Sequence, residues 1–320
     1  MKQNKFNVVG MGDLVADLMV SVDGFPIEAG SAQLTNKVEL QPGGMGNFLI
    51  AGQRIGLSMI PIDLLGDDQN GKFLVDVLKE EEIDTSFLEQ VLGVGTREII
   101  VLANEAGKHA FIAYRDERFP FHGLNQKWQC GLEKADALLT VGYSLSEQYI
   151  KSTLLEAMKF VRDRKKKVFF DPGPLIDLKK DDVFRKAFSL SDVVLLTDDE
   201  LELATGGRTP EYARMLFDYG VELVCVKLGQ KGNFIVKHNQ EIQCSGFKVQ
   251  VCDTNGAGDS FAAAFIYGYL HGWPLLEVGT FANVMGAVKV QKFGAGRNVP
   301  TVSEIKEMIK NKNIALPDYK

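Results

Sequence analysis

Asp253-Thr254-Asn255-Gly256-Ala257-Gly258-Asp259-Ser260 is the stretch around which we expect the chain to be organised. It follows a strand-like apolar run, residues 247–252, and it opens a helix-like run, residues 260–270. A turn of small residues between a strand and a helix leaves several backbone N–H groups without partners, beside the positive end of the helix dipole. Glycine also lets a ligand approach the backbone closely. The stretch therefore predicts an anion site of the kind that binds phosphate.

Asp259 adds a negative charge at the edge of this predicted anion site. A carboxylate there repels a bound phosphate, so it gives a plain phosphate site no advantage. It is useful if it accepts the proton of a hydroxyl that attacks phosphorus. The alternative is an Asp that only caps the helix. The anion turn and the adjacent charge together favour the catalytic interpretation.

Residues 253–259 resemble the C-terminal signature of the ribokinase-like (PfkB) carbohydrate kinases. The resemblance implies ATP-dependent phosphoryl transfer, with Asp259 as the catalytic base. It also implies that the backbone of Gly256, Ala257 and Gly258 forms the anion hole, and that Mg²⁺ bridges the ATP phosphates. Relatives hold a monovalent cation such as K⁺ in this region, so we expect one near Asp253.

Composition limits the other possibilities. A chain of 320 residues, 45% hydrophobic, can bury a large core as one α/β domain or two smaller ones. The net charge of −6 gives no basic surface for nucleic acid. The four cysteines are scattered, as expected for buried thiols in a reducing compartment. We find neither a signal peptide nor a membrane span and predict a cytoplasmic protein.

The N-terminal region predicts a buried strand over residues 6–10, followed by Asp13 and Asp17. A Gly-x-Gly pair at the strand end hints at a dinucleotide-binding fingerprint, but Val15 occupies the third glycine position. Residues 12–18 resemble the first-strand segment of the kinase family, whose Asp binds sugar hydroxyls. That resemblance implies a substrate-binding role for Asp17, and we include Asp13 beside it.

Residues 42–47 resemble the first signature of the same family, which implies that Gly43, Gly44 and Asn47 contact the substrate. The gap from Gly44 to Asn47 is one residue shorter than in typical ribokinases. Residues 66–72 match most of a Walker A pattern, but Phe73 stands where Ser or Thr would hold magnesium. We interpret that segment as a capped turn before a helix.

Two β-rich runs, residues 97–102 and 109–114, flank a hairpin signal at residues 104–108. With short strands between residues 20 and 40, they predict a small second sheet. The family resemblance implies a β-lid from about 18–41 and 96–118 that covers the sugar and often forms a dimer contact, so we expect a homodimer. The Tyr114-Arg115 pair resembles one that related kinases bring to the substrate, which implicates Arg115.

From residue 137 onward, strands and helices alternate, as a parallel sheet with crossovers requires. Ligands gather at the carboxyl ends of such strands. There Thr197 and Glu200 resemble a family Asn-x-x-Glu motif tied to phosphate and magnesium, with Thr197 in place of Asn. The resemblance further implies nucleotide contacts, which fall at Lys227, Gly229, Gly232, Asn283 and Gly294.

We therefore predict one α/β domain over residues 1–320, a three-layer α/β/α fold with a mainly parallel sheet and a small β-lid. The predicted function is ATP-dependent phosphorylation of a hydroxyl on a fructose- or ribose-like sugar. The segment after Asp171-Pro172 lacks an Arg that would pair with an acid sugar. A nucleoside kinase and a non-catalytic kinase-like regulator remain the alternatives.

Overall fold

A central β-sheet of nine strands runs through the part of the chain that the computed structural model describes, residues 5–104, 108–120, 123–176 and 181–318. In spatial order its strands are β13 (Gln240–Ser245), β12 (Gly232–Lys237), β11 (Leu223–Lys227), β10 (Val193–Thr197), β9 (Lys167–Asp171), β8 (Ala137–Val141), β1 (Asn7–Met11), β4 (Ser58–Gly66) and β5 (Leu88–Val91). Neighbouring strands from β11 to β5 are parallel, and β12 and β13 extend the sheet as antiparallel strands.

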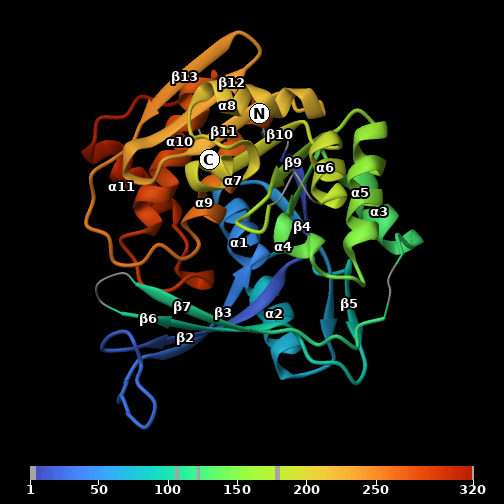
Figure 1. Ribbon diagram of the computed structural model, residues 1–320, viewed down its shortest axis with the longest axis vertical. Helices are drawn as coiled ribbons and strands as arrows, with labels where there is room; N and C mark the ends of the chain where they lie inside the picture. The colour runs from blue at the N-terminus through green and yellow to red at the C-terminus, as the bar shows by residue number, and fades with distance from the viewer. Residues whose placement is uncertain (1–4, 105–107, 121–122, 177–180, 319–320) are drawn as a thin grey trace.

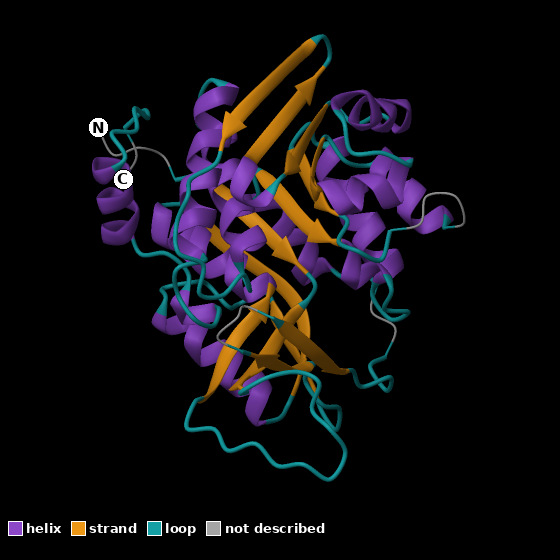
Figure 2. Cartoon of the chain, turned by 60° about the vertical axis from the view of Figure 1, so that its left-hand side comes forward, coloured by secondary structure: helices purple, strands orange, loops and turns teal. Residues whose placement is uncertain are grey.

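Helices cover both faces of this sheet (Figures 1 and 2), because successive residues of each buried strand point to opposite sides. In β8, for example, Leu138 packs into one hydrophobic cluster and Leu139 into the other. One face is covered by α1 (Met45–Ile55), α2 (Gln69–Glu80), α9 (Ala257–Leu270), α10 (Leu275–Lys289) and α11 (Val302–Asn311). The opposite face is covered by α3 (Gln126–Lys134), α5 (Lys151–Asp163), α6 (Asp182–Ser189), α7 (Asp198–Thr205) and α8 (Pro210–Arg214). Shorter helical turns are α4 (Gly142–Leu145), η1 (Met215–Tyr219), η2 (Gly229–Lys231) and η3 (Gly296–Asn298).

A smaller sheet lies across the lower part of the molecule in Figure 1. Its order is β3 (Val38–Gly44), β2 (Leu14–Ser21), β6 (Glu98–Ala103) and β7 (His109–Tyr114). The predicted lid segments were 18–41 and 96–118, whereas β2 already begins at Leu14 and β3 continues to Gly44. These extra residues bring Asp17 and Gly43 into the sheet. The predicted fold class, a mainly parallel sheet with helices and a second small sheet, is confirmed.

Two local predictions were wrong. Residues 247–252 form no strand: they are an irregular segment ahead of the anion turn, and the Cys252 N–H donates to the Val290 carbonyl at 2.7 Å. Phe247, Val249 and Val251 line a cavity, so the alternating apolar pattern does not come from pairing in a sheet. Helix α9 begins at Ala257, three residues before the predicted start, because Gly256 with φ 75° serves as its N-cap.

Two further features bear on the sequence predictions. The turn at residues 66–72 is capped as expected, with Asp68 accepting from the backbone N–H of Gly71 at 2.7 Å. Residues 105–107 of the predicted hairpin lie outside the described residues. Within the described ranges, no helix is long and apolar enough to cross a membrane.

Candidate active site

The turn that leads into α9 presents free backbone donors. Ala257 N–H donates to the Thr254 carbonyl at 3.2 Å, and Ser260 N–H donates to the Gly256 carbonyl at 3.0 Å. The N–H groups of Gly256, Gly258 and Asp259 have no hydrogen-bond acceptor among the described residues. These donors lie at the positive end of the helix dipole, so the turn can stabilise an anion.

Asp259 projects from the first turn of α9 and is held from a distant part of the chain. Asn47, in the first turn of α1, donates its Nδ2 to Asp259 Oδ2 at 2.9 Å. The Gly296 N–H in turn donates to Asn47 Oδ1 at 2.6 Å, which fixes the orientation of the amide. Burial raises the pKa of Asp259 to about 6, with Asp171 adding to the rise and Asn47 and Lys227 opposing it. A carboxyl with such a pKa is ionised at neutral pH and can still accept a proton.

Lys227 brings a positive charge to the same turn. Its Nζ forms an ion pair with Asp171 Oδ2 at 2.8 Å and lies 3.6 Å from the place where a Cβ on Gly258 would sit. Burial lowers the pKa of Lys227, but Asp171 and Glu200 more than compensate and hold it above its usual value. The lysine is therefore charged and points at the anion turn, not at the solvent.

Glu200 and Thr197 form a capping box at the start of α7. Thr197 N–H donates to Glu200 Oε2 at 2.7 Å, and Glu200 N–H donates to Thr197 Oγ1 at 3.2 Å. Burial and the nearby Asp171 raise the pKa of Glu200. The Oε1 atom of Glu200 has no hydrogen-bond partner among the described residues, so this carboxylate can cap the helix and still face a ligand.

The carboxylate of Asp17, on β2, lies on the small-sheet side of the site and leaves one oxygen unsatisfied. Its Oδ1 is buried and has no hydrogen-bond partner among the described residues. Burial raises the pKa of Asp17 to about 7, while the Asn255 side chain opposes the rise and the charge of Asp259 adds to it. A buried acceptor without a partner is costly, and a sugar hydroxyl would satisfy it.

Gly43 and Gly44 make room for two carboxylates. A Cβ on Gly43 would lie 2.1 Å from the Asp17 carboxyl carbon, so only glycine fits there without displacing Asp17. A Cβ on Gly44 would lie 2.2 Å from the carbonyl oxygen of Asp13, the half-buried residue between β1 and β2. Burial raises the pKa of Asp13 to about 8. The two glycines therefore allow β3 to pass directly beside the predicted substrate residues.

Arg115 lies at the edge of this region, just after β7. Its Nη1 donates to Ser146 Oγ at 2.9 Å, and its charge counteracts the rise in the pKa of Asp13. A second arginine, Arg97, is buried nearby and already engaged. It contacts Asp63, and it donates to Glu147 at 2.9 Å and Tyr149 at 2.8 Å.

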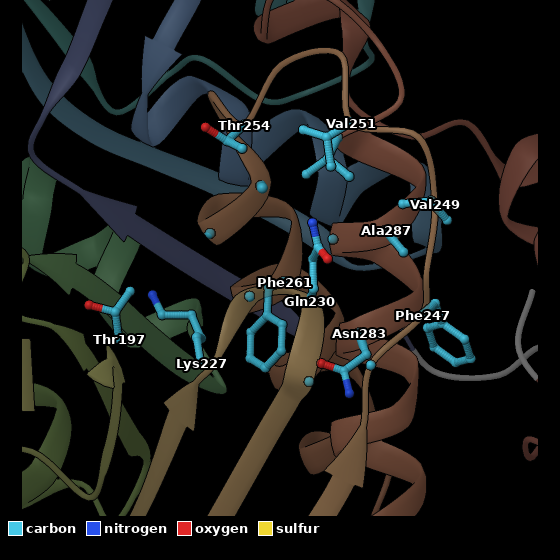
Figure 3. Close-up of a pocket in the computed structure, with 17 residues that line it drawn as sticks. Thr197, Lys227, Gln230, Phe247, Val249, Val251, Thr254, Phe261, Asn283 and Ala287 are labelled. Carbon is cyan, nitrogen blue, oxygen red and sulfur yellow. The ribbon is translucent and has the colours of Figure 1, made fainter. Parts of the chain in front are cut away.

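A cavity of about 470 Å³ opens on the other side of the anion turn (Figure 3). Five of the six residues predicted to contact the nucleotide line it, namely Thr197, Lys227, Gly229, Gly232 and Asn283. Gly294 does not. Lys227 and Thr197 lie at one side, and Phe247, Val249 and Ala287 lie at the other (Figure 3). The cavity therefore runs from a charged end at the anion turn to an apolar end.

The apolar end of the cavity suits the base of ATP, and its charged end suits the phosphates and Mg²⁺. The apolar walls suit a base, and Asn283 lies among them with its amide already bonded to Asn233 and to the carbonyls of Cys244 and Ser245. At the charged end, Asp171 and Glu200 are carboxylates near Lys227. Mg²⁺ is held by one or two carboxylates together with substrate phosphates and water. Among the described residues, no cluster of three or more His, Cys, Asp or Glu could hold a metal ion without such a ligand.

Both carboxylate oxygens of Asp253 are engaged. Oδ1 lies 2.7 Å from His109 Nε2 and accepts from the Asn255 N–H at 2.8 Å, and Oδ2 accepts from the Gly294 N–H at 2.7 Å. Burial opposes ionisation, but these contacts bring the pKa of Asp253 below its usual value. The metal contact predicted for Asp253 stays a prediction. Gly294 likewise stays a predicted nucleotide residue, although its N–H serves Asp253.

Sequence reasoning missed several residues at the site. Asp171 pairs with Lys227, and His109 of β7 joins the small sheet to Asp253. The Tyr143 phenol lies among acidic groups: burial raises its pKa to about 12, and the charges of Asp13, Glu200, Asp171 and Asp259 contribute. The position of Asp171 and Tyr143 at strand ends was the available signal. His109 carried none, because its partner is 144 residues away.

Comparisons with known proteins agree with this geometry. Residues 5–302 match the family described as pfkB family carbohydrate kinase. A 5-dehydro-2-deoxygluconokinase from Bacillus licheniformis is 25% identical over 96% of this chain and 97% of its own length. A ribokinase from Bacillus subtilis is 26% identical over 95% of this chain and 99% of its own length.

The fold has a counterpart among solved structures. Arabidopsis thaliana ribokinase complexed with ribose and ATP superposes with a TM-score of 0.82 and 22% identity, over 96% of this chain and 99% of that one. The family model spans nearly the whole chain, and the relatives named above match it over almost their full length. The chain therefore belongs to the pfkB family of carbohydrate kinases.

Proposed function

We propose that this kinase transfers the γ-phosphoryl group of ATP to a hydroxyl of a neutral, fructose- or ribose-like sugar. One observation carries the proposal: the half-buried carboxylate of Asp259, held by Asn47, lies beside the free N–H groups of Gly256 and Gly258. A base next to an anion site is the arrangement that proton abstraction and phosphoryl transfer require together.

Each group then has a role. Asp17 accepts hydrogen bonds from the sugar and orients it, and Asp259 accepts the proton of the attacking hydroxyl. The N–H groups of the turn and the Lys227 ammonium stabilise the charge on the transferred phosphoryl group, which is usually the largest catalytic contribution. Mg²⁺ bound to ATP would neutralise phosphate charge, with Glu200 and Asp171 as the residues able to hold it, directly or through water.

The burial of the pocket favours a neutral sugar. Asp13, Asp17 and Asp259 have pKa values raised to about 8, 7 and 6, mainly by burial, so their surroundings disfavour negative charge. An acid sugar would bring a negative charge into the same surroundings. One of the relatives named above is a 5-dehydro-2-deoxygluconokinase, whose name indicates an acid sugar. Arg115 is the side chain we expect to decide between the two. Arg97 is fully buried against Asp63 and Glu147, whereas Arg115 is partly exposed and its contact with Glu147, at 3.7 Å, is longer.

ADP release with MgATP over a panel of acceptors tests the proposal. The panel contains fructose, ribose, 5-dehydro-2-deoxygluconate, adenosine and inosine, each assayed with the wild type and with Asp259→Asn. We expect turnover with a neutral sugar that Asp259→Asn abolishes. If the wild type prefers 5-dehydro-2-deoxygluconate to the neutral sugars and Arg115→Gln loses that preference, the substrate is an acid sugar and not a neutral one. Turnover of nucleosides alone would identify a nucleoside kinase, and ATP binding without any turnover would support a regulator.

We also propose that the small sheet is a lid and that its outer face pairs with a second copy of the chain. On β7, Ile112 and Tyr114 lie on the same face because alternate residues of a strand point the same way, and they are 59% and 50% exposed. Phe111 points to the other face and stacks on His109, which contacts Asp253. Exposed apolar side chains on one face of a strand are typical of an interaction surface. Light scattering tests the dimer: Ile112→Lys with Tyr114→Glu should give a monomer, whereas an unchanged mass would exclude this face. The cytoplasmic location stays a prediction.

A further inference from the structure

Lys289, the last residue of α10, is a fully buried lysine without a carboxylate partner. None of its surface is exposed, and it is among the largest completely buried side chains. Its Nζ donates to the Lys292 carbonyl oxygen at 3.2 Å and to the Asp253 carbonyl oxygen at 3.5 Å. No carboxylate of the described residues lies within 4.0 Å of it. Among the described residues, its hydrogen-bond partners are thus backbone carbonyls alone.

This burial is costly and calls for a reason. An ammonium loses its hydration when it is buried, and lysines are almost never enclosed unless they are paired. Burial lowers the pKa of Lys289 to about 8, while the charges of Asp253 and Asp259 favour the protonated form. A lysine that merely caps a helix C-terminus can do so from the surface. Capping alone therefore does not account for the position.

The two carbonyls belong to the two loops that support the anion turn. Asp253 directly precedes the turn. Lys292 opens the loop that donates Gly294 N–H to Asp253 and Gly296 N–H to Asn47, the residue that holds Asp259. A Cβ on Gly256 would also meet Ala295 of this loop at 3.3 Å. The Lys289 ammonium thus bridges both supports of the base and its anion site.

We propose that the Lys289 ammonium is a built-in cation that joins these two loops, and that it takes the place of the monovalent cation expected near Asp253. K⁺ binds in proteins to groups of backbone carbonyl oxygens. Here two such oxygens already accept from a fixed positive charge, which fills the space between them and repels a second cation. The kinase then works without added K⁺. The catalytic part of this inference rests on the proposed function, whereas the cation part does not.

Melting temperature tests the cation part without any substrate. Wild type, Lys289→Ala and the control Lys306→Ala, an exposed position on α11, are unfolded in KCl, NH₄Cl or choline chloride at equal ionic strength. We expect wild type and Lys306→Ala to melt alike in the three salts. Truncation in Lys289→Ala leaves a space lined by carbonyl oxygens. The melting temperature of this variant should therefore be lower in choline chloride, and it should rise to a plateau as the concentration of K⁺ or NH₄⁺ increases. Saturable stabilisation of the wild type by K⁺ would overturn the proposal even if the variant failed to fold.

Kinetics in the same salts test the catalytic part. Lys289→Met, which keeps the length of the side chain but not its charge, should lower kcat about tenfold or more while the KM for ATP stays near that of the wild type. K⁺ should restore Lys289→Ala in part, but not Lys289→Met, whose side chain fills the space. Full wild-type kcat of Lys289→Met in choline would overturn this part. If no acceptor gives turnover, the proposed function fails, and the melting experiment still decides where the cation is.

Discussion

Asn47 Nδ2 lies 2.9 Å from Asp259 Oδ2, although 212 residues separate the two side chains. The contact joins the first turn of α1 to the first turn of α9, the two helices whose N-termini meet at the site. Because Gly296 N–H holds the other end of the Asn47 amide, the carboxylate of Asp259 is fixed in position and direction. A base held in this way loses little conformational entropy when it adopts its reactive geometry.

Asp259→Asn should strongly reduce phosphoryl transfer and leave ATP binding intact. The change removes the proton acceptor while it keeps the shape, so we expect kcat to fall roughly 10²–10⁴-fold. ADP release measures kcat, and calorimetry measures ATP affinity. A variant that retains more than a tenth of the wild-type kcat would show that another group accepts the proton.

The pH profile of the wild type should have an acidic limb that belongs to Asp259. Its pKa is raised to about 6, and a base works only when it is ionised. We therefore expect kcat, measured with saturating sugar so that the titration of Asp17 contributes little, to rise as pH increases through about 6. The residual activity of Asp259→Asn should lack this limb. An unchanged limb in the variant would assign it to another group.

Asn47→Ala should move that limb to higher pH. The Asn47 hydrogen bond stabilises the ionised form of Asp259 and lowers the pKa of that residue. Loss of this hydrogen bond should therefore shift the midpoint of the acidic limb upward by about one pH unit. Activity should then fall much more at pH 6.5 than at pH 8.5. An equal loss at both pH values would mean that Asn47 acts by packing alone.

Gly43→Ala should damage sugar binding selectively. The new Cβ would lie 2.1 Å from the carboxyl carbon of Asp17, so Asp17 must move. We expect the sugar KM to rise roughly 10- to 100-fold while the KM for ATP changes little. Gly24→Ala is the matched control, because a Cβ there meets nothing within 4 Å. If the two variants have the same KM for the sugar, Asp17 does not contact the sugar.

Asp17→Asn should stabilise the protein at high pH while it impairs catalysis. Burial raises the folded-state pKa of Asp17 from 3.8 to about 7, so the folded state binds more protons than the unfolded state between these values. The contribution of Asp17 to the free energy of unfolding therefore falls as pH rises from about 4 to 7. The variant should melt a few degrees above the wild type at pH 8 and much closer to it at pH 4. The exposed Asp23→Asn should show no such difference, and a pH-independent gain would indicate another cause.

The sequence by itself determined the parallel sheet and the family, and it located the small-residue turn that opens α9. The turn could be predicted because its free donors and its acidic residue are neighbours in the chain, from Asp253 to Asp259. The sheet could be predicted because short buried strands alternate with helices. The irregular segment at residues 247–252 shows the limit of such patterns, since the side chains that line a cavity alternate as those of a strand do.

Only the tertiary structure decided which groups face each other across the site. Asn47 and Asp259, Lys227 and Asp171, and His109 and Asp253 are 212, 56 and 144 residues apart, and no local pattern records such pairs. Lys289 is the clearest case, because its sequence position marks an ordinary helix end. Its complete burial between two carbonyls depends on where the loops at residues 253 and 292 meet. Burial and long-range contacts set the charge of a side chain, and both arise only when the chain is folded.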